Sequence, residues 1–205
     1  MSSSKWNLDP YERNGLSSES KSITQAPEKR WSLSDTQLVI WAQVGNETAF
    51  ELLYERYYEQ IYIFQTRMVG DSGIGEELAQ ETFLKAWKAL NALRDPTKFR
   101  SWLYRIASNE VYNYYRHPDV PSVELMLVEC EVSISGPEEE VEAQERLQEA
   151  LALVWPEKCR ACLILYHING YSIPLIAEFL GIEQSSVRQY ISSGLNQLKR
   201  SLRGR

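Results

Sequence analysis

The sequence predicts an all-helical protein of two small domains. Apolar residues recur at spacings of three and four along most of the chain, which is the period of a helix, and no segment shows the strict alternation of a strand. Three prolines among acidic residues interrupt this pattern at 117–140, as is typical of a linker. With 205 residues, 43% of them hydrophobic, the chain can build two cores, and this composition excludes wholesale disorder.

The first domain is expected at 34–117, after a serine-rich arm at 1–33 that lacks a sustained period and is predicted to be disordered. Ser34 can cap the first helix, and the glycine-containing segment 70–73 separates the second helix from the third. The remaining helices of this domain are expected at 49–64, 76–90 and 99–116, the last one ending before Pro118.

A linker at 118–137 leads to the second domain, 138–205. This domain begins with an acidic segment that favours a helix, and its apolar residues again follow the helical period. Its helices are expected at about 138–154, 157–168, 173–180 and 185–202.

The net charge of -6 hides an uneven distribution. Residues 117–150 carry 10 acidic side chains and 1 basic one, whereas 151–205 carry 3 acidic and 7 basic ones. Because phosphate binding needs local Lys and Arg, the C-terminal segment is compatible with nucleic acid. The chain lacks the roughly 18-residue apolar run of a membrane span and an apolar N-terminal signal, so we expect a cytoplasmic protein without membrane insertion and with reduced cysteines.

A helix-turn-helix is the sharpest motif. Ala177, Gly181 and Val187 follow one another at four and six residues. A small residue lets two helices touch, a glycine permits the tight turn, and an apolar residue anchors the second helix. Arg188 and Gln189 can then read base edges while serines hold phosphates, although a plain helical hairpin is the alternative. The predicted duplex-binding residues are Ser185, Ser186, Arg188, Gln189, Ser192, Ser193, Asn196, Lys199 and Arg200.

The helix at 99–116 and the loop before it interleave aromatic and basic side chains. Surfaces that bind single-stranded nucleic acid combine such cations with stacking platforms, where one stacked base contributes about 1–3 kcal/mol. Phe99 and Trp102 are equally compatible with a place in the core. The residues predicted to bind an opened strand are Lys98, Arg100, Trp102, Arg105, Asn109, Tyr112, Asn113 and Arg116.

In this order the segments resemble those of bacterial RNA polymerase sigma factors of the extracytoplasmic-function (ECF) group of the sigma-70 family. The resemblance covers about 34–202. Its matching segments are AFELLYERYYEQIY (49–62), EELAQETFLKAW (76–87), FRSWLYRIASNEVYNYYRH (99–117) and YSIPLIAEFLGIEQSSVRQYISSGLNQLKRSL (171–202), together with Trp155-Pro156, where the family usually has Leu-Pro.

The resemblance implies a factor that is not an enzyme, needs no cofactor, binds core RNA polymerase and helps to open promoter DNA. The helix at 76–87 would dock on the clamp helices of the largest polymerase subunit, 91–116 would capture the opened minus-ten strand, and the helix from Ser185 would read the minus-thirty-five duplex. Family members are often held silent by an anti-sigma factor, which is a further candidate partner. The implied polymerase-binding residues are Glu76, Glu77, Gln80, Glu81, Phe83 and Lys85.

Several residues depart from the family pattern. Leu175 stands where a glutamate is typical, and Asn113 where an aspartate is common. Along the recognition helix, uncharged residues replace basic ones at Tyr190, Ser193, Asn196 and Gln197. Each lost phosphate contact lowers the salt slope by about one, so we expect duplex binding that is weaker and less salt-dependent than usual.

Two other classes of protein remain open. A stand-alone helix-turn-helix regulator would leave the aromatic helix and the acidic docking helix unexplained. A degenerate sigma-like protein would bind polymerase or another partner without initiating. Cys159 and Cys162 form a CxxC near His167, but the pair lies in a predicted helix with no second pair, which favours small buried residues over a metal or redox site.

Overall fold

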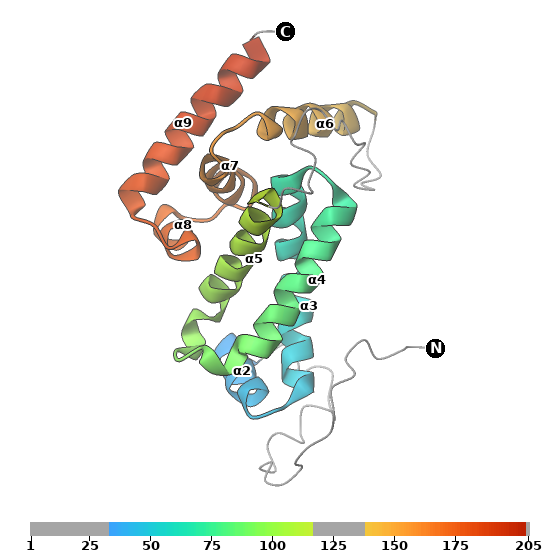
Figure 1. The fold of residues 1–205 in the computed structure, drawn as a ribbon, viewed down its shortest axis with the longest axis vertical. Coiled ribbons are helices and arrows are strands. Elements are labelled where there is room, and N and C mark those ends of the chain that lie inside the picture. The colour runs from blue at the N-terminus through green and yellow to red at the C-terminus, as the bar shows by residue number, and fades with distance from the viewer. Residues whose placement is uncertain (1–32, 117–137, 204–205) are drawn as a thin grey trace.

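The computed structural model describes residues 33–116 and 138–203, and every regular element in these two ranges is a helix (Figure 1). The predicted all-helical class is therefore confirmed. The expected N-terminal arm, up to residue 32, and the expected linker lie outside the described residues. The first domain consists of α2 (Asp35–Gln43), α3 (Glu47–Val69), α4 (Ser72–Ala89) and α5 (Phe99–Arg116), with 3-10 turns at Leu90–Ala92 and Pro96–Lys98.

Polar side chains begin the helices of the first domain. Ser34 accepts a hydrogen bond from the Gln37 amide, and the Gln37 side chain accepts one from the Ser34 amide, so the two form a capping box. Asn46 caps α3 and Asp71 caps α4. The third helix was expected only from Glu76. Because Asp71 supplies a strong cap directly after the left-handed Gly70, α4 begins four residues earlier.

All four helices contribute to the core of the first domain. Phe64 and Phe83 are fully buried, and burying a phenylalanine side chain contributes about 1.5–3 kcal/mol. A buried amide joins three of the helices: Gln65 Nε2 donates to the Thr82 hydroxyl at 2.9 Å and to the Ala107 carbonyl at 3.1 Å. These two hydrogen bonds fix α4 and α5 relative to α3.

The second domain consists of α6 (Glu138–Ala152), α7 (Glu157–Leu163), α8 (Ile173–Leu180) and α9 (Gln184–Arg203). The helix expected over 157–168 is instead α7 followed by a π turn at Ile164–Ile168. Cys159 and Cys162 are buried free thiols in α7, which confirms their interpretation as small buried residues. Burial raises the pKa of the Cys162 thiol to about 12.

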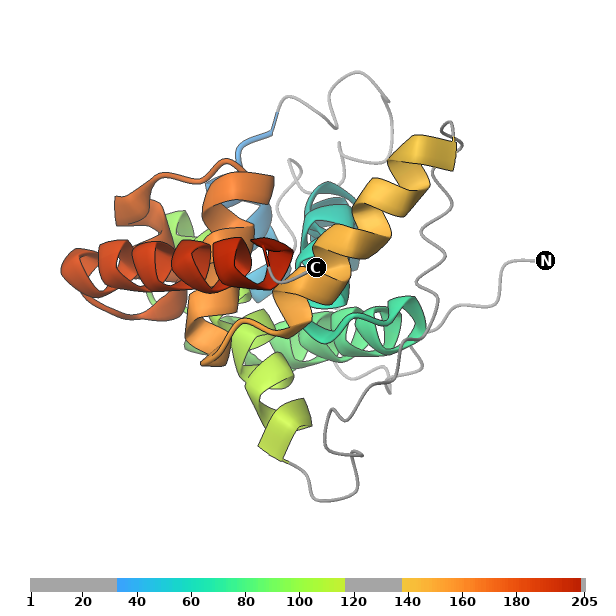
Figure 2. The same ribbon diagram turned by 90° about the horizontal axis from the view of Figure 1, so that it is seen from above.

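The two domains pack against each other. Helix α8 lies beside α5, and α6 and α7 contact α3, as the two views in Figures 1 and 2 show. Within the described ranges, no helix combines the length and the apolar character that a bilayer crossing requires.

Candidate nucleic-acid and protein interfaces

Helices α8 and α9 form the predicted helix-turn-helix. Gly181 ends α8 in the left-handed conformation, with φ of 63°, and its amide donates to the Ala177 carbonyl. Ala177 and Val187 are buried where the two helices meet. Gly194 lets α9 approach α7, since a Cβ there would lie 2.6 Å from Cδ1 of Leu163. The three residues that predicted the motif therefore occupy the places that their types require.

The outer face of α9 carries the residues predicted to bind duplex DNA. Arg188 and Gln189 are exposed, whereas Val187 and Ile191 are buried beneath them. Along the rest of the helix, Ser185, Ser192, Ser193, Asn196, Lys199 and Arg200 are exposed, and Ser186 is half-buried. This face offers hydrogen-bonding groups and cations along one side of a helix, which is the arrangement that major-groove readout uses.

Helix α5 distributes its predicted strand-binding residues over two environments. Asn109, Asn113 and Arg116 are exposed toward its C-terminal end. Trp102 is half-buried, and Phe99 is a core residue with no exposed surface. The Tyr112 ring is half-buried, and desolvation raises the pKa of its hydroxyl.

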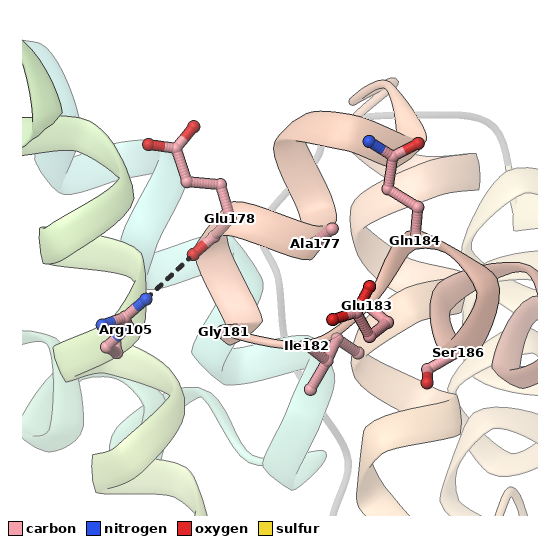
Figure 3. A pocket seen from close by; sticks show the side chains of 8 residues that line it. All are labelled: Arg105, Ala177, Glu178, Gly181, Ile182, Glu183, Gln184 and Ser186. Carbon is pink, nitrogen blue, oxygen red and sulfur yellow. Dashed lines mark hydrogen bonds between the residues drawn. The ribbon is translucent and has the colours of Figure 1, made fainter.

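The basic residues near the start of α5 face the second domain. Lys98 forms an ion pair with Glu178 at 2.7 Å, and the Arg100 guanidinium lies 4.5 Å from the centre of the Tyr171 ring. The Arg105 guanidinium donates to the Glu178 carbonyl at 3.5 Å (Figure 3). An open pocket lies between Arg105 and the turn of the helix-turn-helix, beside this contact (Figure 3).

Helix α4 exposes the acidic part of the predicted polymerase-binding set. Glu76, Glu77 and Gln80 are exposed, and Glu81 is half-exposed. Gln80 donates to Glu76 at 3.0 Å, which orients the two side chains along the helix.

The other two members of that set lie differently. Lys85 pairs with Glu110 of α5 at 2.5 Å, and this hydrogen bond raises the pKa of Lys85. Phe83 has no exposed surface, so it supports the surrounding side chains from within the core instead of reaching a partner.

A row of half-exposed tyrosines beside α4 was not among the predicted sites. The Tyr54 and Tyr58 rings stack at 4.9 Å, and Tyr62 continues the row at 6.1 Å. Burial, followed by the neighbouring Tyr54 and the charge of Glu76, raises the pKa of Tyr58 to about 12. The four-residue spacing of these tyrosines is visible in the sequence of the helix expected at 49–64, but the sequence alone does not separate them from Tyr57, which the structure buries.

The fold and these surfaces define a DNA-binding helix-turn-helix protein with an additional helical domain. The family model described as Sigma-70 region 2 matches residues 53–119, and that described as Sigma-70, region 4 matches residues 145–198. The chain belongs to the ECF group of the sigma-70 family.

Two sequence relatives agree with this assignment. The chain is 30% identical over 172 residues to the ECF RNA polymerase sigma factor SigW of Bacillus subtilis (strain 168), across 78% of this chain and 91% of that protein. It is 33% identical over 173 residues to the ECF RNA polymerase sigma-E factor of Escherichia coli (strain K12), across 78% and 89% of the two chains.

Two solved structures share the fold. CnrH in complex with the cytosolic domain of CnrY matches with a TM-score of 0.63 and 26% identity, over 83% of this chain and 97% of that chain. The sigma factor RpoE of Bartonella quintana, in complex with the anti-sigma factor NepR, matches with a TM-score of 0.59 and 19% identity, over 75% and 96%, and supports the fold alone. Family, homologues and fold together make this chain a sigma factor that binds RNA polymerase and directs it to promoters.

Proposed function

We propose that the first domain, 34–117, docks on core RNA polymerase and holds the opened promoter strand, whereas the second domain, 138–205, anchors the factor on upstream duplex DNA. One observation carries this division: α9 presents an exposed row of hydrogen-bonding residues suited to duplex DNA, while α5 carries the half-buried rings of Trp102 and Tyr112 on the same helix as the exposed Arg116, a combination suited to unstacked bases. The factor acts in the cytoplasm and contributes no catalytic group or cofactor of its own.

The acidic face of α4 is the proposed contact with the clamp helices of the largest polymerase subunit. Glu76 and Glu77 are exposed there, and electrostatic complementarity across such an interface favours both the rate and the specificity of association. The stacked row of Tyr54 and Tyr58 adjoins this face through Glu76, and it adds apolar area that the charged residues lack.

An anti-sigma factor is a further proposed partner. Support comes from a solved structure that shares the fold, since CnrH was captured in complex with the cytosolic domain of a second protein, CnrY. A partner of this kind would compete with polymerase for the same two domains.

Two alternatives to this proposal are a stand-alone helix-turn-helix regulator and a degenerate sigma-like protein. A stand-alone regulator gives no reason for a first domain that matches sigma-70 region 2 over 53–119. A degenerate interaction protein would bind polymerase without initiating, so factor-dependent transcription distinguishes it from the proposed function. The separate tasks of the two domains can be tested separately.

The docking assignment is tested by charge reversal on α4. We expect Glu77→Lys to weaken binding to core polymerase about tenfold, which corresponds to about 1.4 kcal/mol. Glu145→Lys makes the same change at an exposed position of α6 and serves as the matched control. The measurement is the equilibrium affinity of each labelled full-length variant for core enzyme in the absence of DNA. Equal affinities for the two variants would contradict docking through α4.

A further inference from the structure

A small aromatic groove lies on the outer side of α3. Its cavity of about 220 Å³ is lined by Phe50, Glu51, Tyr54 and Glu55, and the ring of Tyr58 stacks on that of Tyr54 at 4.9 Å. We call this cavity, together with the adjoining Tyr58 ring, the tyrosine groove. Small-molecule sites usually measure roughly 300–1,000 Å³, so a cavity of this size suits one or two side chains of a protein segment better than a metabolite.

The core of the first domain holds the groove in shape. The Trp87 ring of α4 lies 4.8 Å from the Phe50 ring, and the Phe83 ring meets the Tyr54 ring edge-on at 4.8 Å. Phe50 is 6% exposed and Phe83 has no exposed surface. Because these rings are fixed by packing between α3 and α4, a segment that docks here pays little for ordering the groove itself.

A row of glutamates borders the groove. Exposed carboxylates recur every fourth residue along α3, and so lie on one side of that helix, at Glu47, Glu51, Glu55 and Glu59. Like charges at this spacing destabilise a helix by about 0.2–0.5 kcal/mol per pair, and none of the residues that line the cavity is basic. Cations along the row would relieve this repulsion, and tyrosine faces also attract cations. The groove therefore favours a segment that combines basic and aromatic side chains.

Charge selects one of the two long segments that lie outside the described residues. Residues 118–137 carry four acidic side chains and no lysine or arginine, so the glutamate row repels them. The segment KSITQAPEKRW, 21–31, carries Lys21, Lys29 and Arg30 against a single acidic residue, and it ends at Trp31. This segment has the basic and aromatic side chains that the groove favours.

The entry point of the chain places the segment 21–31 within reach. Leu33 packs against the core, and its carbonyl accepts a hydrogen bond from Nη2 of Arg56 on α3 at 3.1 Å. Arg56 directly follows Glu55 of the groove lining, so the arm joins the domain about one helix diameter, 10–12 Å, from the groove. Eleven extended residues span up to about 36–40 Å, which is ample to pass around α3.

We propose that residues 21–31 dock in the tyrosine groove of their own chain, with Lys29 and Arg30 along the glutamate row, and compete there with core polymerase. Burial and then the charge of Glu76 raise the pKa of Tyr54, so the groove adjoins the acidic face of α4. A tethered segment meets its site at an effective concentration in the millimolar range, so a weak contact suffices to occupy the groove. The competition rests on the proposed docking of polymerase through α4, whereas the docking of the arm does not.

Hydroxyl-radical footprinting of the free full-length protein tests the docking. The reversed-arm variant combines Lys29→Glu with Arg30→Glu, and the matched control makes the same charge change elsewhere in the arm, with Lys5→Glu and Arg13→Glu. We expect oxidation of Tyr58 to rise several-fold in the reversed-arm variant and to stay at the wild-type level in the control. Tyr58 reactivity that is equal in the reversed-arm variant and the wild type would overturn the proposal.

Two further footprints identify the occupant. Glu51→Lys with Glu59→Lys, added to the reversed-arm variant, exchanges the charges of the two partners, and we expect it to restore the wild-type protection of Tyr58. Protection that is not restored would show that the arm does not lie on the glutamate row and would overturn the proposal. In the wild type we expect the protection to be independent of protein concentration. Its loss on dilution would assign the groove to the arm of a second copy and would equally overturn docking within one chain.

The affinity for core polymerase tests the competition. Labelled full-length reversed-arm and control variants are titrated with core enzyme in the absence of DNA. We expect the reversed-arm variant to bind roughly threefold or more tightly than the control does, because the groove is no longer occupied by the arm. Equal affinities would overturn the competition. The footprints are recorded without polymerase, so a failure of the arm to dock is distinguishable from a failure of α4 to bind polymerase.

Discussion

The side chain of Gln197 binds both backbone polar groups of Trp155. Its Oε1 accepts from the Trp155 amide at 3.0 Å, and its Nε2 donates to the Trp155 carbonyl at 2.7 Å. Helix α9 thereby holds the turn between α6 and α7. A lysine, which the family resemblance leads one to expect here, has donors but no acceptor and could make only one of these bonds. The uncharged residue at this position therefore has a structural role.

Gln197→Ala should lower the free energy of unfolding by about 1–2 kcal/mol, because two backbone groups lose their partner. Gln189→Ala, at an exposed position of the same helix, should change it by less than about 0.5 kcal/mol. Urea unfolding of the full chain measures both. Equal stabilities of the two variants would show that the paired bonds contribute nothing.

Arg188→Ala should reduce discrimination between the cognate promoter and a variant of its upstream element by about 1–3 kcal/mol, the contribution of a bidentate base contact. Arg188→Lys keeps the charge and should lose most of the same discrimination, because an ammonium group lacks the fork geometry. Transcript ratios from the two promoters in one reaction measure this. An unchanged promoter profile would remove Arg188 from base recognition.

Lys199→Ala should weaken binding to duplex DNA about equally for all sequences and lower the salt slope by about one, because a lysine binds phosphate as a point charge. The side chain is exposed near the C-terminal end of α9. Promoter affinities of the holoenzyme across a salt series give the slope. A loss confined to certain sequences, with the slope unchanged, would assign Lys199 to base readout.

The Cys162 thiol makes the stability of the folded chain depend on pH in the alkaline range. Its thiol has an ordinary pKa of 9.0, which burial raises to about 12 in the folded protein. Above pH 9.0 the unfolded chain therefore binds fewer protons than the folded one, so stability falls as pH rises. The stability that the protonated Cys162 thiol contributes is fully present below pH 9.0. It is lost as the pH rises toward the pKa of about 12 in the folded protein.

Cys162→Ala should flatten this fall, as measured by urea unfolding between about pH 8 and pH 10 in the presence of a thiol reductant. The wild-type slope is the reference, since the buried tyrosines titrate in both proteins. Identical slopes would show that the Cys162 thiol ionises as readily in the folded state as in the unfolded state.

The sequence predicted those features of the fold that interactions between residues close in the chain determine. The spacing of Ala177, Gly181 and Val187 gave the helix-turn-helix, because one turn and its packing contact fix that motif. The beginning of α4 was misplaced because the glycines were given more weight than the Asp71 cap, which satisfies the first turn. Interactions between residues close in the chain therefore determine both the helix-turn-helix, which was predicted, and the start of α4, which was misplaced.

Contacts between segments far apart in the sequence were not predicted. Tyr104 and Tyr171 are 67 residues apart, and Arg160 and Met68 are 92 residues apart. Neither pairing leaves a periodic signal, since each depends on how two finished domains pack. Consequently the sequence predicted that α5 is aromatic and basic, but it did not predict that the second domain covers the first turns of that helix.

Reconstituted transcription tests the central claim most directly. Full-length protein and core RNA polymerase are incubated with fragmented genomic DNA, and transcript starts are mapped with and without the factor. The account predicts factor-dependent starts at discrete positions that share two spaced upstream elements, with Arg188→Ala altering their selection. Binding to core polymerase without any factor-dependent start would contradict it.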